Sequence, residues 1–356
     1  MHEFLGDNPI FIFPANQIGG HEIMAIKIIN DLLPFVKCIK LYVTPNSLKR
    51  IEPLILDNEK IIISTLYSNT IKFEYIHNFI NFYYKLKIKN QIENLIKNKY
   101  SSFILVQGDI EIGSSYLIEL LNKNVKVFSY IPYAHDSKTV GKKFYIFREI
   151  YAKYLFSKNI NFITISNFFK NQILSRNNKS NVYVIENSVR NLEKIKLKRK
   201  NIFSTSKNKF KLYVIGRVDY KHKGQDILLD ALNKLDSKIL NHISLNIIGE
   251  GPDSENLRTR VEKDLNEIDL NMLGWKAEPW NYAFEADLIV IPSRFEGVPL
   301  VMLEALELKI DVIGTRRDGM LDYLEEKNLF KNCEDLSLLI YKKLENFKKL
   351  DRTTDL

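Results

Sequence analysis

Cysteine is scarce in this sequence, with only Cys38 and Cys333 among 356 residues, and these two lack the spacing of metal ligands. This scarcity excludes a disulfide framework and indicates a reducing compartment. The histidines, which are His2, His21, His77, His135, His222 and His242, form no metal constellation in the sequence either. We therefore expect a cytoplasmic protein without a zinc site.

Long apolar runs are also missing. Lys, Asn or Asp interrupts every hydrophobic segment, so no stretch of 18 residues is suited to cross a membrane. The opening sequence MHEFLGDNPIFIFPANQ has no basic start and no long apolar stretch, so we expect no signal peptide. The composition, 45% hydrophobic and 27% charged, is typical of a soluble globular protein, and the length favours two domains.

The charge is unevenly distributed along the chain. Residues 1–200 carry a formal charge of +13, whereas residues 201–356 carry −4. The basic half includes the aromatic-rich stretch FINFYYKLKIKN (79–90). Such a face suits an anionic membrane surface or nucleic acid, and a plain solvated helix face is the third interpretation.

Strand-like and helix-like segments alternate through both halves. The strand candidates are 10–13, 39–44, 60–65, 102–108, 125–131, 161–166 and 181–187, and then 210–216, 243–249, 270–273, 286–293 and 311–315. The helix candidates include 21–33, 71–98, 224–236, 253–266 and 299–308. This alternation predicts parallel sheets covered by helices on both faces. The polar segment 191–209 is predicted to be a linker between domains at 1–190 and 210–356.

Ligands of open parallel sheets bind beyond the carboxyl ends of the strands, so the loops after strands carry the candidate site. The loop and helix RFEGVPLVMLE (294–304) follow one strand, and Pro299 suits the first helical position. Free N–H groups near Gly297 would bind an anion. Glu296 and Glu304 would accept hydrogen bonds from sugar hydroxyls at either side. The alternative is a helix-start charge at Glu296 and a solvent-facing Glu304.

A second loop, GRVDYKHKG (216–224), places two cations after another strand. Arg217 and Lys223 suit a pyrophosphate whose charge needs stabilising, although a generic basic loop, or Lys221 in place of Lys223, would also fit the sequence. Further along, Asp253 is a plausible helix N-cap, and Trp275 is a candidate to pack on a nucleotide base.

The first half offers two weaker motifs. Gly19 and Gly20 in GGHE (19–22) could cradle a phosphate or a sugar, or form only a tight turn, and the absence of GxGxxG gives no support to a dinucleotide site. In YIPYAHDS (130–137), His135 beside Asp136 could bind a hydroxyl or assist proton transfer. A surface histidine is the alternative.

Taken together, these motifs resemble the glycosyltransferase family 4 (group 1) retaining enzymes of GT-B fold. The matching text is GRVDYKHKGQDILLDAL, LNIIGEGPDSENL, NMLGW and ADLIVIPSRFEGVPLVMLEAL, with weaker matches such as GGHE and AHDS in the first half. The resemblance covers nearly the whole chain, but its specific motifs lie in residues 216–325. It implies two Rossmann-like doubly wound domains facing each other across a cleft, the first binding the acceptor and the second the donor.

The resemblance also implies roles. Arg217 and Lys223 would bind the donor diphosphate, Glu304 the ribose, and Glu296 the transferred sugar and the charge at its anomeric carbon, while His135 would touch the sugar or the acceptor. Phosphate contacts would come from the backbone of Gly297, Val298, Leu300, Val301, Gly19 and Gly20. No metal or cofactor is implied, and the co-substrate would be a nucleotide-diphosphate sugar, with UDP or GDP as the nucleotide.

The sequence departs from the family at two places. DLSLLIYKKLENFKKLDRTTDL leaves room for one terminal helix, where the family commonly has a long helix crossing back onto the first domain, so that crossing is abbreviated or the chain is shortened. The usual pair of a small residue and a glycine after DVIGT is replaced by Arg316, Arg317 and Asp318.

We therefore expect a retaining glycosyltransferase that moves a hexose to a glycan or lipid-linked acceptor in bacterial surface polysaccharide biosynthesis, either lipopolysaccharide or capsule. The phosphate leaving group would accept the acceptor proton during front-face attack. Contact with anionic membrane through the basic first half is expected, and a nucleic-acid partner is not. The alternatives are a sugar-nucleotide epimerase of the same fold and a non-catalytic scaffold subunit of a glycan-assembly complex.

Overall fold

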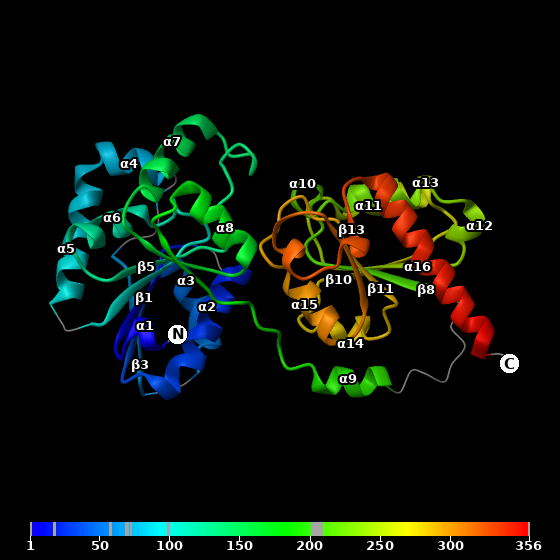
Figure 1. Cartoon of the computed structure of the whole chain (residues 1–356), viewed down its shortest axis with the longest axis horizontal. Helices are drawn as coiled ribbons and strands as arrows, with labels where there is room; N and C mark the ends of the chain where they lie inside the picture. The colour runs from blue at the N-terminus through cyan, green and yellow to red at the C-terminus, as the bar shows by residue number, and fades with distance from the viewer. Residues whose placement is uncertain are drawn as a thin grey trace. The chain divides into compact units, whose positions relative to one another are not determined.

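A computed structural model describes residues 2–16, 19–56, 59–67, 71, 73–97, 100–200 and 209–354. The chain divides into two compact units, Met1–Asn187 and Ser188–Leu356, each with its own sheet (Figure 1). Each unit is described by itself below.

The first unit contains a seven-stranded parallel sheet in the order β3-β2-β1-β4-β5-β6-β7. Its strands are β1 (Pro9–Phe13), β2 (Ile39–Val43), β3 (Ile61–Thr65), β4 (Ser102–Val106), β5 (Val127–Tyr130), β6 (Asn161–Thr164) and β7 (Asn181–Val184). All residues of β1, β4 and β5 are buried, as expected of central strands that helices cover on both faces. Continuous apolar runs such as PIFIF are the sequence cause of this burial.

Helices cover both faces of that sheet. They are α1 (His2–Leu5), α2 (Gly20–Leu32), α3 (Pro45–Ile51), α4 (Glu74–Ile80), α5 (Phe82–Ile96), α6 (Ser114–Asn122), α7 (Tyr145–Phe156) and α8 (Asn167–Arg176). The single helix predicted over 71–98 is two helices, α4 and α5, because Asn81 has non-helical backbone angles. The Asn81 side chain accepts a hydrogen bond of 2.9 Å from the N–H of Tyr84 and so caps α5.

The second unit repeats this architecture with a six-stranded parallel sheet in the order β10-β9-β8-β11-β12-β13. Its strands are β8 (Phe210–Ile215), β9 (Ile243–Ile248), β10 (Asp269–Gly274), β11 (Leu288–Ile291), β12 (Asp311–Thr315) and β13 (Leu329–Phe330). Its helices are α9 (Glu193–Lys200), α10 (Tyr220–Lys223), α11 (Gln225–Leu232), α12 (Ser237–Leu240), α13 (Ser254–Asp264), α14 (Trp280–Ala283), α15 (Leu300–Glu307) and α16 (Cys333–Thr354). The predicted doubly wound α/β class is confirmed in both units.

The predicted linker, 191–209, differs from the structure over its first part. Residues 193–200 form α9 and belong to the second unit, while 201–208 lie outside the described residues. Arg199 donates hydrogen bonds of 2.8 and 3.0 Å to the carbonyls of Phe284 and Ala286, and Ile195 is buried. The many charged residues of this segment gave it the composition of an exposed linker. The partners of Arg199 are distant in sequence, so the sequence did not reveal that the segment is packed.

The chain ends, as predicted, in a single helix, α16, which packs along α11. The two-residue strand β13 was not predicted, since a run this short has no periodicity to detect. Within the described part of the chain, no helix has both the length and the apolar character needed to cross a membrane.

Candidate active site

The loop after β8 brings two predicted cations to the carboxyl end of the second sheet. Asp219 caps α10 and accepts a hydrogen bond of 3.0 Å from Nδ1 of His222. Arg217 precedes this cap with 68% of its side chain exposed, and Lys223, 35% exposed, ends the short helix. Burial alone would raise the pKa of Asp219, but hydrogen bonds from His222 and the nearby charge of Arg217 together lower it. The carboxylate of Asp219 therefore holds this loop in place, while Arg217 and Lys223 remain accessible to solvent.

Gly224 lets this loop lie directly against the loop that follows β11. Its φ is +64°, and a Cβ atom on it would stand 2.1 Å from the carbonyl oxygen of Pro292. Arg294 then ties the two loops together through two hydrogen bonds, 2.6 and 2.7 Å, to the carboxylate of Asp226. Such a two-bond arginine–carboxylate pair fixes orientation as well as distance.

Glu296 lies where the two loops meet. Its Oε1 accepts hydrogen bonds from Nζ of Lys223 and, at 2.8 Å, from the hydroxyl of Ser293. The Glu296 N–H donates to Oδ2 of Asp318 at 3.0 Å, and only 12% of the Glu296 side chain is exposed. The structure thus brings together two predicted residues, Lys223 and Glu296, that are 73 positions apart in the sequence.

The segment after Glu296 approaches a third loop closely. The N–H of Gly319 donates to the carbonyl of Gly297 at 3.1 Å, and a Cβ atom on Gly319 would lie 2.5 Å from that oxygen. α15 then begins at Leu300, with Pro299 as its N-cap rather than its first helical residue, because the ψ of Pro299 is 122°. The first N–H groups of a helix, here those of Leu300 and Val301, have no acceptor within the helix and suit an anion.

Glu304 lies inside α15 and is only 2% exposed, so it is not the solvent-facing residue of the alternative interpretation. Its Oε1 accepts from Nε of Arg190 at 2.6 Å, and its Oε2 accepts from Nε1 of Trp280 at 2.7 Å. Trp280 is 1% exposed, whereas the Arg190 side chain is 39% exposed. Both carboxylate oxygens of Glu304 therefore already accept a hydrogen bond. The donor Trp280 is held by its burial, whereas the partly exposed Arg190 has room to move into solvent.

In the first unit, the loop after β1 leads to α2. Gly19 immediately precedes this helix, Gly20 is its first residue, and both glycines are exposed. The buried carboxylate of Glu22 accepts from the Gly19 N–H at 2.8 Å, and this bond fixes the loop. Burial raises the pKa of Glu22. A Cβ atom on Gly20 would meet no atom within 4 Å, so the backbone there borders open space.

Two histidines lie near the carboxyl end of β5 in this unit. Nε2 of His21 is 3.1 Å from the carbonyl of Tyr130, and burial lowers the His21 pKa to about 4. His135 follows β5, and its Nδ1 lies 2.9 Å from Nε2 of Gln172. The neighbouring Asp136 accepts hydrogen bonds from the backbone N–H groups of Lys138 and Thr139 and so stabilises the turn in which it lies. His21 was not among the predicted site residues.

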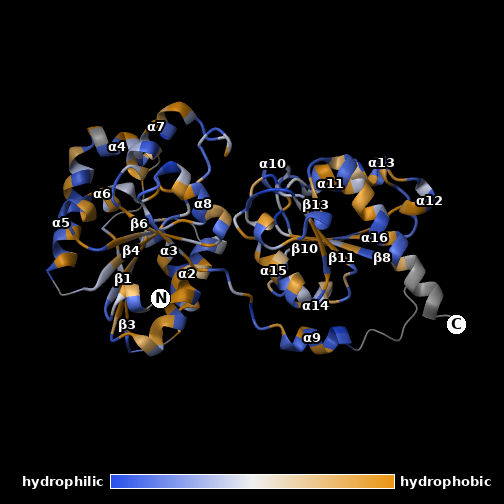
Figure 2. Cartoon of the chain, in the orientation of Figure 1, coloured by the Kyte–Doolittle hydropathy of each residue, from blue (hydrophilic) through white to orange (hydrophobic). Residues whose placement is uncertain are grey.

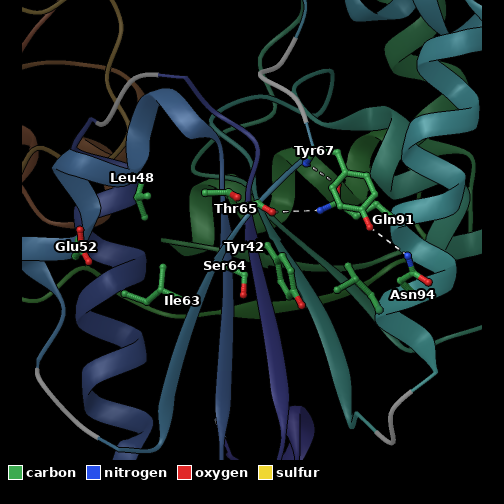
Figure 3. A pocket seen from close by; sticks show the side chains of 10 residues that line it. Tyr42, Leu48, Glu52, Ile63, Ser64, Thr65, Tyr67, Gln91 and Asn94 are labelled. Atoms are coloured by element: carbon green, nitrogen blue, oxygen red, sulfur yellow. Dashed lines mark hydrogen bonds between the residues drawn. The ribbon is translucent and has the colours of Figure 1, made fainter.

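A hollow of about 600 Å³ lies in the first unit beside β3, and none of the predicted residues is among those that line it (Figure 3). The side chains that line it include those of Tyr67, Thr65, Gln91 and Asn94. Asn94 donates to the Tyr67 hydroxyl at 3.1 Å, and Gln91 accepts from the Tyr67 N–H at 3.1 Å. Three of its polar side chains are thus engaged with one another, and we assign the hollow no role.

Four residues that order the site were not predicted for it: Arg190, Trp280, Ser293 and Asp318. Asp318 was noted only as a departure from the family pattern, yet it is 5% exposed and holds the backbone of Glu296.

Asp253 stands at the start of α13 but does not cap it, because its carboxylate accepts from the Tyr220 N–H at 2.7 Å. No group of three or more acidic, histidine or cysteine side chains in the described ranges could hold a metal ion.

Comparison with known proteins gives a family match over the second unit. Residues 195–354 match the model of the glycosyl transferases group 1. An uncharacterised glycosyltransferase of Methanocaldococcus jannaschii is 28% identical over 236 residues, which are 64% of this chain and 61% of that protein. The UDP-Gal:alpha-D-GlcNAc-diphosphoundecaprenol alpha-1,3-galactosyltransferase of Escherichia coli is 26% identical over 160 residues, 44% of this chain and 40% of that one. The chain thus matches less than two thirds of each of these relatives.

Solved structures show the fold over nearly the whole chain. The lipopolysaccharide outer core galactosyltransferase WaaB has a TM-score of 0.70 at 18% identity, covering 95% of this chain and 90% of its own. HepE of Anabaena, solved with UDP and glucose, has a TM-score of 0.69 at 14% identity, covering 97% and 92%. The predicted GT-B fold, built from two Rossmann-like domains, is confirmed.

Proposed function

We propose that the chain is a retaining hexosyltransferase using a UDP-sugar donor, in keeping with the match of residues 195–354 to the group 1 glycosyl transferases. The contact between Lys223 and Glu296 is the observation that carries this proposal. It joins a cation suited to a diphosphate with a carboxylate suited to a sugar. Both stand beside the start of α15, where backbone N–H groups favour an anion.

The cations act on the leaving group. In the proposed complex the diphosphate lies between Arg217, Lys223 and the first N–H groups of α15. As the bond from the anomeric carbon to the phosphate oxygen breaks, negative charge grows on that oxygen, and fixed positive groups stabilise it. In this proposal these side chains and amides do the work that a metal ion does elsewhere, and no metal takes part.

Glu296 acts on the sugar. When the diphosphate draws Lys223 away, the carboxylate of Glu296 is left facing the transferred hexose. It hydrogen-bonds the hydroxyls and stabilises the positive charge that develops at the anomeric carbon. Ser293 and Asp318 hold the side chain and the backbone of Glu296 in place. Such support preserves the geometry while Lys223 changes partner.

The acceptor hydroxyl attacks from the face that the diphosphate leaves. Its proton passes to the departing phosphate oxygen, a new glycosidic bond forms and the anomeric configuration is retained. This route needs no protein nucleophile. The roles of His135, Gly19 and Gly20 toward the sugar and the phosphate remain predictions of the motifs.

Two similar proteins support the choice of donor and acceptor. HepE was solved with UDP and glucose, and the Escherichia coli relative is described as transferring galactose from UDP-Gal to a diphosphoundecaprenol-linked sugar. We therefore propose UDP as the nucleotide and a glycan or lipid-linked saccharide as the acceptor, in surface polysaccharide synthesis on the cytoplasmic side of the membrane.

The test is a thermal-shift panel of UDP-, GDP- and ADP-sugars, followed by transfer assays with the stabilising donor. Binding stabilises the folded state by mass action, so a UDP-sugar should raise Tm more than the others. Glu296→Gln should keep this UDP-dependent shift and lower kcat about 100-fold or more, because it removes charge stabilisation in the transition state. Glu255→Gln, in the exposed first turn of α13, is the matched control and should change neither value.

The outcomes separate this proposal from its alternatives. Release of UDP only when an acceptor is present identifies a transferase, and conversion of the sugar without an acceptor identifies an epimerase. A chain that shows neither reaction and no Tm shift with any nucleotide sugar is a scaffold, and that result rejects the proposal.

A further inference from the structure

The first unit exposes an unusual amount of apolar surface in three neighbouring helices. Among the described residues, 24 large hydrophobic side chains are exposed, and 12 of them lie in the ranges 73–86 and 144–154. Scattered exposed hydrophobics are ordinary, but a gathered set marks a binding surface. Arg217, Lys223, Glu296 and Glu304 belong to the other unit.

The helix α7 shows the feature most clearly, because it is apolar on two sides. Its buried side consists of Tyr151, Ala152, Leu155 and Phe156, which join the core of the unit. Its other side carries Ile146, Phe147, Ile150 and Tyr154, which are 58, 66, 62 and 43% exposed. A helix that is apolar all round is normally buried. The second side of α7 is therefore suited to a partner or to a lipid phase.

The apolar surface continues from α7 onto α4. Phe144 and Phe73 stand immediately before these two helices, and their rings lie 6.1 Å apart. Tyr75 in α4 and Tyr151 in α7 also face each other at 6.2 Å. Figure 1 shows α4 and α7 side by side, and Figure 2 shows hydrophobic residues along α7. We call the exposed set Phe73, Phe144, Tyr145, Ile146, Phe147 and Ile150 the aromatic ridge.

Exposed lysines flank the aromatic ridge. Lys143 and Lys153 are exposed beside its α7 part, and the one carboxylate within residues 143–158, that of Glu149, is paired with Arg176 at 2.8 Å. Nearby Lys85 is exposed on α5. The first unit as a whole has 23 Lys and Arg residues against 15 Asp and Glu residues. Apolar tips ringed by lysines match the boundary between acyl chains and anionic headgroups.

We propose that the aromatic ridge docks the first unit onto an anionic lipid bilayer. Its phenylalanines and isoleucines enter the headgroup boundary while Lys143 and Lys153 face the lipid phosphates. A second copy of the chain fits less well, since a symmetric contact brings two surfaces flanked by lysines of like charge together. Nucleic acid fits less well because aliphatic tips such as Ile146 and Ile150 offer no plane on which bases stack.

The docking surface extends the proposed function by naming where the protein meets the membrane that holds a lipid-linked acceptor. The proposed docking rests on the proposed function only in assuming that the acceptor is linked to a lipid. The surface itself is argued from exposure and charge, so binding to vesicles tests it without any transferase assay.

The test is flotation of the full chain with phosphatidylcholine vesicles, with and without phosphatidylglycerol. The wild type should float with the anionic vesicles and lose binding as salt rises. Phe147→Ser/Ile150→Ser should weaken this partition roughly tenfold or more. The control pair Leu338→Ser/Tyr341→Ser, at exposed apolar positions of α16, should partition like the wild type.

A second variant guards against simple misfolding. Phe144 has a φ of +57°, which an aromatic residue adopts only with strain, so Phe144→Gly relieves the backbone while it removes a ring of the ridge. Its Tm should be unchanged or higher while its vesicle binding falls. A retained UDP-dependent Tm shift in these variants separates failure of docking from failure of the proposed function.

Three results would overturn the proposal. One is a wild-type chain that floats with neither vesicle. Another is equal partition of the ridge variants and the wild type. The last is a wild-type dimer in light scattering that the ridge variants convert to monomer, since the surface would then belong to a second copy of the chain.

Discussion

At the scale of single residues, the surroundings of Glu304 define how a donor must enter. The predicted ribose contact requires the carboxylate oxygens that now accept from Arg190 and Trp280. Trp280 is buried and fixed, so the exchange must take place at Arg190, which is partly exposed. In the proposed complex, Arg190 would therefore compete with the ribose for one oxygen of Glu304.

The first prediction concerns this competition. Arg190→Gln should tighten UDP binding about tenfold in calorimetry, because the ribose no longer displaces a charge-assisted hydrogen bond. The ligand-free protein should lose roughly 1 kcal/mol of unfolding free energy, since a buried carboxylate loses its partner. Lys196→Gln, which breaks only surface ion pairs, is the control and should bind UDP normally. Weaker UDP binding in Arg190→Gln would mean that Arg190 contacts the donor itself.

His21 gives the second prediction, a pH dependence of stability. Burial lowers its pKa to about 4 in the folded state, whereas an unfolded histidine titrates near 6.5. Between these pH values the unfolded chain binds the extra proton, so stability falls as the pH decreases from about 6.5 to 4, by up to roughly 3 kcal/mol. Urea unfolding at pH 7 and pH 5 measures this loss.

The variant His21→Gln isolates that contribution from the other titrating groups. It should lose less stability between pH 7 and pH 5 than the wild type does. His242→Gln, in the short connection before β9, should lose as much as the wild type. Equal losses in His21→Gln and the wild type would show that His21 titrates normally in the folded protein.

Motif residues were predictable from the sequence, but most of their supporting partners were not. Lys223 and Glu296 each follow a strand, so their meeting at one sheet edge follows from the topology. Asp318 contacts Glu296, which is 22 positions away in the sequence, and Arg190 contacts Glu304, which is 114 positions away. No local pattern specifies such contacts. For Asp318 the signal was its departure from the family pattern, and for Arg190 there was none.

At the scale of elements, apolar runs located the strands well. Twelve of the thirteen strands coincide with predicted runs, with ends within about three residues, because buried parallel strands are continuously hydrophobic. The break between α4 and α5 was missed, since the apolar spacing continues through Asn81 while its side chain caps a new helix. The helix α9 within the predicted linker was missed because contacts distant in sequence hold it in place.

The third prediction tests the junction between α10 and α11. Gly224→Ala should cost about 2 kcal/mol or more of unfolding free energy, because the residue has a positive φ and its Cβ would overlap the Pro292 carbonyl. It should also weaken donor binding, since the clash separates the loop of Lys223 from that of Glu296.

Gly20→Ala is the matched control for this change. It places a Cβ in open space without a positive φ and should cost less than about 0.5 kcal/mol in denaturant unfolding. If both variants prove equally stable, the two loops do not need the close approach that Gly224 permits.

At the scale of the whole molecule, each unit has its own sheet and its own buried core. The fourth prediction is that residues 188–356 fold alone, with α9 retained, and unfold cooperatively in thermal denaturation followed by circular dichroism. UDP should still raise the Tm of this fragment, because Arg217, Lys223, Glu296 and Glu304 all lie within it. A fragment beginning at residue 201 lacks α9 and should melt at a lower temperature.

The order of strands has a consequence for biosynthesis. In each sheet the first strand to be made, β1 or β8, lies in the interior, and every later strand joins an edge that is already exposed. A chain leaving the ribosome can therefore extend each sheet in the order of translation, without inserting a late strand between two early ones. All residues of the first unit precede those of the second, so the first unit can finish folding while the second is still being synthesised.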